Sequence, residues 1–244
     1  MKRGDAFSLV LVVWLSACGS SGSGLFDEEG WASLRSPDRG QITYNAGYDG
    51  GTTNFVAPLT FVGDGVTDAN VQSLFTTADP SVGVVDGVLS LSGLPISTAL
   101  PVNAILIRST GTGATTVTGN VNGQFYTANL NVIGFTPQDV ALGNQRYNAP
   151  ANPDGNLRQA CSACHGQPDL MNHSTTFLAD LTDSEIIRTA IQGIAVERRN
   201  VSNGEIQTYE PLGGQHVWGV TAEEAAGLVA YLRSRPPTLS LIHI

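Results

Sequence analysis

The stretch Cys161-Ser162-Ala163-Cys164-His165 has the spacing C-x-x-C-H, which is typical of a c-type haem attachment site. Two thiols at this spacing can form thioether bonds to the two vinyl groups of a porphyrin, and the histidine that follows can bind the iron. A thiol–disulfide redox motif has no need of this histidine. A structural zinc site needs a second ligand pair, which the single remaining cysteine, Cys18, does not supply. The motif therefore predicts one covalent haem c, held by Cys161 and Cys164, with His165 as an iron ligand.

The N-terminus predicts export from the cytoplasm. Lys2 and Arg3 precede an apolar run over residues 6–15 that is too short to span a bilayer. The letters Leu15-Ser16-Ala17-Cys18 resemble the bacterial lipoprotein box, which implies a signal peptide over residues 1–17 and a lipid on Cys18. An ordinary signal peptide cut near Ala17 or Gly19 is the alternative.

The region after Cys18 predicts a tethered protein that faces the periplasm or the cell surface. The run Gly19-Ser20-Ser21-Gly22-Ser23-Gly24 is a flexible tether, so residues 18–40 are expected to be a lipidated linker. Gly19 is not an obvious inner-membrane retention signal, which favours the outer membrane.

The charge balance argues against a nucleic-acid partner. The chain has 21 acidic residues against 12 lysines and arginines, and Lys2 is its only lysine. Binding to a nucleic-acid backbone requires cations that neutralise phosphates, so we expect no nucleic-acid partner. An acidic surface can instead be steered toward basic proteins, including redox partners, and a solvated surface that only aids solubility is the alternative.

Residues 41–135 are rich in Gly, Thr, Val and Asn and contain neither cysteine nor histidine. Turn signals at Asp86-Gly87 and Asn122-Gly123 separate short β-prone runs, and the second of these is a strong hairpin signal. The expected strands of a β-sandwich are Phe55–Val62, Val82–Val85, Val88–Leu91, Ala104–Arg108, Ala114–Val121 and Gln124–Ile133. The letters of Ala78–Gly87 and Gly113–Val117 resemble bacterial Ig-like domains of group 2 type, which implies a spacer or protein-binding role.

Residues 136–238 predict a set of helices around the C-x-x-C-H motif. A helix is expected over Gln138–Tyr147, and capping boxes at Thr182/Glu185 and Thr221/Glu224 begin two more. The last helix has an apolar stripe made of Ala225, Leu228, Val229 and Leu232.

This order of helices, together with C-x-x-C-H and the segment Leu-Val-Ala-Tyr-Leu-Arg-Ser at 228–234, resembles the class I cytochrome c family. The resemblance implies a small helical shell around one haem and outer-sphere electron transfer. The expected fold class is therefore multidomain, an all-β Ig-like sandwich followed by an all-α cytochrome c domain.

The second axial ligand of the iron is left open by the sequence. The family usually supplies a methionine from the loop before the last helix, but residues 194–220 contain none. His216 lies in that loop, five residues before Thr221, and is the preferred candidate. Met171, His173 and a vacant site are the alternatives.

The leading hypothesis is a monohaem electron-transfer lipoprotein of the cell envelope, and an enzyme is less favoured than an electron carrier. The alternatives are a haem-based sensor that binds small ligands and a surface adhesion or assembly protein with an accessory haem. The tail at residues 239–244 is similar to a translated transposon sequencing adapter, so His243 is not counted as a ligand.

Overall fold

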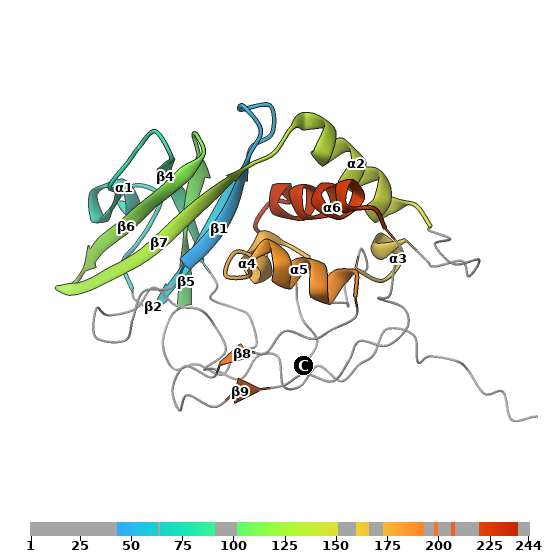
Figure 1. Cartoon of the computed structure of the whole chain (residues 1–244). Coiled ribbons are helices and arrows are strands. Elements are labelled where there is room, and N and C mark those ends of the chain that lie inside the picture. The colour runs from blue at the N-terminus through green and yellow to red at the C-terminus, as the bar shows by residue number, and fades with distance from the viewer. Residues whose placement is uncertain are drawn as a thin grey trace, which may run out of the picture.

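Two β-sheets packed face to face form the larger part of the structure (Figure 1). The computed structural model describes residues 43–62, 64–90, 102–150, 160–165, 173–192, 198–199, 206–207 and 220–238. One sheet has the strand order β1 (Thr43–Tyr48), β7 (Gln124–Gly134), β6 (Gly113–Val121) and β3 (Phe75–Thr77). The other has the order β2 (Val56–Val62), β5 (Val102–Ser109) and β4 (Gly83–Ser90). A short helix, α1 (Val71–Leu74), precedes β3, and β8 (Arg198–Arg199) pairs with β9 (Ile206–Gln207).

Alternating burial along the strands builds the core between the sheets. In β7 the side chains of Tyr126, Ala128, Leu130 and Val132 are buried, while the residues between them are partly exposed. This period of two is expected for a strand with one face in a core. Both sheets contribute to a shared apolar cluster that includes Leu59, Phe61, Phe75, Ile105, Ile107, Val117 and Leu130.

The predicted hairpin at Asn122-Gly123 is confirmed. β6 and β7 pair in antiparallel fashion up to Val121 and Gln124, which leaves a two-residue turn. Asn122 and Gly123 have φ values of 53° and 83°. Two positive φ angles are what a type I′ turn requires, and asparagine and glycine adopt them at low cost.

The predicted turn at Asp86-Gly87 is wrong, because this dipeptide lies inside one continuous strand. β4 pairs with β5 on both sides of Asp86, and its register shifts between Val85 and Gly87. The extra residue forms a β-bulge, whose Asp86 carboxylate accepts a hydrogen bond from Arg108 Nε at 3.2 Å.

Three capping boxes begin the principal helices. The predicted boxes at Thr182/Glu185 and Thr221/Glu224 are confirmed at α5 (Asp183–Ala190) and α6 (Ala222–Ser234). A third one, not predicted, joins Thr136 and Asp139 at the start of α2 (Pro137–Asn148). Two shorter helices, α3 (Cys161–His165) and α4 (Thr175–Leu178), complete this layer. In the part of the chain that the structure describes, no helix is long and apolar enough to cross a membrane.

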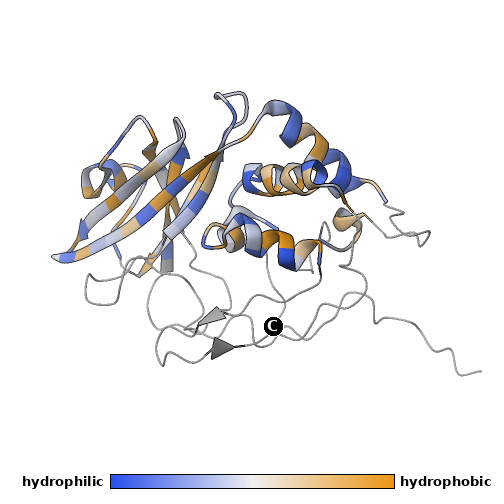
Figure 2. Cartoon of the chain, viewed as in Figure 1, coloured by the Kyte–Doolittle hydropathy of each residue, from blue (hydrophilic) through white to orange (hydrophobic). Residues whose placement is uncertain are grey.

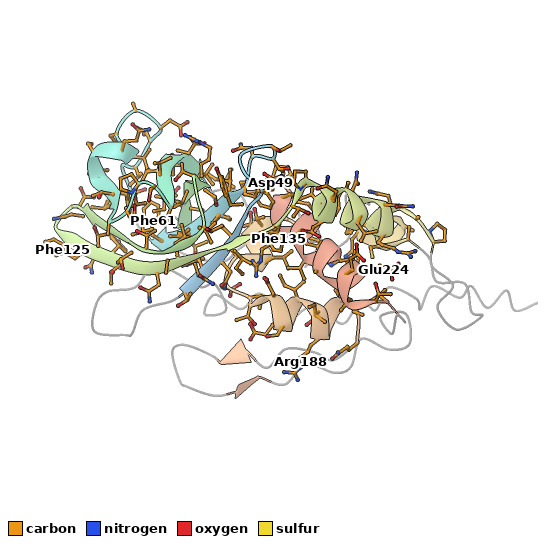
Figure 3. The ribbon with its side chains drawn as sticks, turned by 45° about the horizontal axis from the view of Figure 1, so that its top comes forward. Asp49, Phe61, Phe125, Phe135, Arg188 and Glu224 are labelled. Atoms are coloured by element: carbon orange, nitrogen blue, oxygen red, sulfur yellow. The ribbon has the colours of Figure 1, made fainter. Side chains whose placement is uncertain are left out.

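The helices form one layer beside the sandwich, with α6 lying between α2 and the α4–α5 pair (Figure 1). Hydrophobic residues of α6 face the middle of this layer (Figure 2). Phe135, which links β7 to α2, lies at the junction of the two parts (Figure 3) and stacks on Phe55 with ring centroids 6.2 Å apart.

Strand β1, which the sequence did not reveal, joins the helices to the sandwich. One edge of β1 pairs in parallel with β7. At its other edge the Asn45 N–H donates to Ala179 O at 2.6 Å, and the Asn45 carbonyl accepts from Arg233 of α6 at 2.9 Å. The helical layer therefore covers a sheet edge that would otherwise expose unpaired backbone groups.

The predicted fold class, an all-β Ig-like sandwich followed by an all-α cytochrome c domain, is wrong. The described residues are mostly β-sheet, their helices are short, and the helices do not close into a separate all-α domain. Ala179 of the helical layer belongs to the core of the sandwich, and Arg233 bonds to β1. The structure is a two-sheet β-sandwich with short helices packed against one edge.

The crossing of α2 and α6 gives a testable prediction. A Cβ atom at Gly143 would overlap the carbonyl oxygen of Gly227, whereas a Cβ at Gly227 would lie 3.0 Å from Asp139 O and 3.1 Å from Gly143 N. Alanine also raises helix propensity by about 1 kcal/mol over glycine, which offsets mild crowding. We expect Gly143→Ala to lower the free energy of unfolding by about 2 kcal/mol more than Gly227→Ala, because overpacking against backbone has no rotamer to relieve it. Urea unfolding of both variants measures the difference, and equal midpoints would contradict the prediction.

Candidate functional site

Helix α3 carries the three residues of the predicted haem attachment motif. It is five residues long, from Cys161 to His165. Positions 161, 164 and 165 are separated by three and four residues, and helical geometry places such positions on one side of a helix. Cys161 is partly buried and packs against the apolar cluster of the helical layer, which is centred on Tyr147, Leu228 and Leu232.

Burial further disfavours the thiolate form of Cys161. Loss of hydration raises the pKa of Cys161 to about 11, because the buried thiolate would be poorly solvated. Thiols that act in disulfide exchange have a lowered pKa instead. The thiol is therefore a poor nucleophile for redox exchange at neutral pH.

The imidazole of His173 lies against the imidazole of His165, the last residue of the motif. The rings of His165 and His173 stack with centroids 3.7 Å apart and an interplanar angle of 24°. Two ligands on opposite sides of one iron point their nitrogens at the metal in the planes of their rings, whereas these rings meet face to face. Ligation of the iron by His173 stays a prediction.

Tyr147 supports this stack from the helical core. Its ring meets the His173 ring edge-on, with centroids 5.9 Å apart, and lies 5.2 Å from the ring of Tyr231. The guanidinium of Arg235 lies 5.0 Å from the centre of the Tyr147 ring. Tyr147 is 1% exposed, and its hydroxyl has no hydrogen-bond partner among the described residues. Burial is the main cause that raises the pKa of Tyr147 to about 12.

The residues of α3 fit the covalent attachment of a haem. They supply two cysteine positions one turn apart, the next residue is histidine, and Cys161 borders an apolar cluster. The orphaned Tyr147 hydroxyl adds a buried polar group near Cys161 that a bound group could satisfy. Within the described ranges, no group of three or more His, Cys, Asp or Glu residues could hold a free metal ion.

Three of the predicted site residues cannot be placed. His216, Met171 and the lipidation site Cys18 all lie outside the described residues. The contact between His165 and His173 was not predicted, because periodicity relates residues within one helix or strand, and His173 lies beyond the end of α3 at His165. The contact between Tyr147 and His173 was not predicted either, and the sequence indicated only that Tyr147 ends the helix expected over Gln138–Tyr147.

Comparison with known proteins does not assign the chain to a family. No protein-family model matches the chain, and no curated protein matches it. A solved structure that matches is "Crystal structure of the S-layer protein SbsC domains 4 and 5", at 14% identity and a TM-score of 0.24, over 39% of this chain and 42% of that chain. A likeness this low carries no argument about fold or function. The resemblance to a class I c-type cytochrome domain preceded by a bacterial Ig-like domain is therefore corrected: the described chain is a β-sandwich with short helices, and no haem-binding fold is evident in it.

Proposed function

We propose that the chain is an exported c-type haem protein that passes single electrons. The proposal rests on the local site rather than on fold, because one fold can carry many functions and unrelated folds can carry the same chemistry. Its main support is that Cys161, Cys164 and His165 occupy one helical turn beside an apolar cluster. A haem bound there would supply an iron that changes between ferrous and ferric states.

The chain's own residues have distinct tasks in this proposal. Cys161 and Cys164 would hold the haem, each adding its S–H across one vinyl group, so that both thioether bonds would form without net oxidation. His165 would offer a ring nitrogen to the iron. The apolar cluster beside Cys161 would give the attached haem an apolar neighbourhood.

The raised pKa of Cys161 argues against thiol–disulfide exchange at this motif. A catalytic C-x-x-C motif works through a stabilised thiolate, and a buried thiol with a pKa of about 11 is protonated at neutral pH.

The proposed setting is the cell envelope. A lipid on Cys18 would hold the protein at a membrane facing the periplasm or the cell surface, with the outer membrane preferred. The net charge of −9 fits a basic redox partner.

Expression with and without a c-type haem maturation system tests the proposal. We expect the mature protein to retain haem after denaturation and acid–acetone extraction, with one haem per chain by the pyridine haemochrome assay. A colourless protein with titratable Cys161 and Cys164 thiols would overturn the proposal. A shift of the ferrous Soret band under CO would favour the sensor alternative, since CO needs an open iron position.

A further inference from the structure

We propose that His173 is a positioning residue that fixes the rotational orientation of the His165 imidazole. The inference rests on the proposed haem attachment and concerns a different property of the site. It assigns His173 to the face of the His165 ring and leaves the iron-binding position to other residues.

The first step rests on the geometry of the contact between the His165 and His173 rings. The two rings are 3.7 Å apart and inclined by 24°, which is van der Waals contact across most of one ring face. A ring nitrogen binds a metal in the plane of the ring. Contact on the face therefore does not occupy the edge of the His165 ring that carries its nitrogens, and it does not compete with ligation.

The second step is that His173 is itself held in place. Its ring meets the edge of the Tyr147 ring, which is packed against Tyr231 in the core of the helical layer. The next residue, Ser174, is 1% exposed, and its hydroxyl donates a hydrogen bond to Thr238 O at 3.0 Å. Contacts of the His173 ring and of the buried side chain of the next residue, Ser174, thus restrain the imidazole that covers His165.

The third step follows from the chemistry of a metal-bound imidazole. Donation of its lone pair makes the His165 ring electron-poor, so face-to-face contact with a neutral ring becomes more favourable than between two equal rings. Rotation of His165 about its bond to the metal would break this stack. The stack therefore selects one ring orientation, and ligand orientation is a property that neighbouring residues commonly control in metal sites.

Two substitutions separate stacking from ligation. His173→Phe keeps a flat ring that cannot bind iron, and His173→Leu removes the ring at similar volume. Proton NMR of the ferric haem protein measures the orientation, because the shifts of the four haem methyl groups depend on the plane of the axial imidazole. We expect His173→Phe to keep the wild-type methyl pattern, and His173→Leu to change the order of the methyl shifts or add a second set. Haem content and optical spectrum should stay unchanged in both.

Other results would overturn the inference. An unchanged methyl pattern in His173→Leu would show that the stack does not set the ring orientation. Loss of the wild-type optical ligand signature in both variants would show that His173 binds the iron. A wild-type protein without covalent haem would overturn the proposed function and this inference together, whereas the first two results leave the proposed function intact.

Discussion

The double variant Cys161→Ala/Cys164→Ala is expected to contain no covalently bound haem. Both thioether sulfurs are removed, and denaturation would release a porphyrin held only by His165 and packing. Each single variant should retain one thioether, and the α-band of its pyridine haemochrome should move to longer wavelength because one vinyl group stays conjugated. Haem staining after denaturing electrophoresis and the haemochrome spectrum measure both effects.

The third cysteine of the chain provides the matched control. Cys18→Ala removes the predicted lipid site without touching α3, so this variant, with its export confirmed, should bind one covalent haem and lose only membrane association. Full covalent haem in the double variant would contradict the assignment of the motif. Fractionation of the cells confirms the export of each variant, and loss of haem in exported Cys18→Ala would show that haem attachment does not depend on the α3 cysteines alone.

The Asn122-Gly123 hairpin and the capping boxes were predictable because they depend only on residues that are close together in the sequence. The Asn122-Gly123 hairpin needs only two residues that tolerate positive φ between two strands. The capping boxes at Thr182 and Thr221 each need a hydroxyl and a carboxylate three residues apart. These signals mark where an element begins or turns, although the similar dipeptide Asp86-Gly87 forms a bulge inside β4 instead of a turn.

The arrangement of these elements was not predictable from the same signals. Strand β1 has the letters Thr-Tyr-Asn-Ala-Gly-Tyr, whose glycine and asparagine weaken the strand pattern, and it pairs with β7 more than 80 residues later. The helix pattern of α6 identified an apolar face, yet it gave no sign that Arg233 reaches Asn45 across 188 positions. Without these long-range contacts the helices were assigned to an independent domain.

The candidate site also combines a local motif, which the sequence shows, with long-range contacts, which it does not show. The C-x-x-C-H spacing is local and lies on one helical turn, whereas the neighbours of His165 come from other segments. Tyr147 of α2 and His173 ahead of α4 meet through a tertiary contact between segments that are far apart in the sequence. The sequence therefore predicts which residues would hold a haem, and the structure adds the residues that surround His165.

Arg233→Met is expected to destabilise the protein by about 3 kcal/mol, because removal of a buried, fully bonded charged group leaves its partners unsatisfied. The Arg233 side chain is 1% exposed and bonds to Asp183 Oδ1 at 2.6 Å. It also donates to the carbonyls of Asn45 at 2.9 Å and Leu181 at 2.7 Å. Burial lowers the pKa of the guanidinium, and the Asp183 carboxylate counteracts this effect. Methionine keeps much of the side-chain volume, so the loss reports on the polar contacts rather than on a cavity.

Arg188→Met on the neighbouring helix α5 is the matched control. Arg188 is exposed (Figure 3), so its replacement should change the free energy of unfolding by less than about 0.5 kcal/mol. Urea unfolding of both variants, followed by far-ultraviolet circular dichroism, measures the difference. Because Arg233 joins α6, the α4–α5 turn and β1, its loss should also increase amide hydrogen exchange at Asn45 and Leu181. Equal stability of the two variants would show that the helical layer does not depend on this contact with the sandwich.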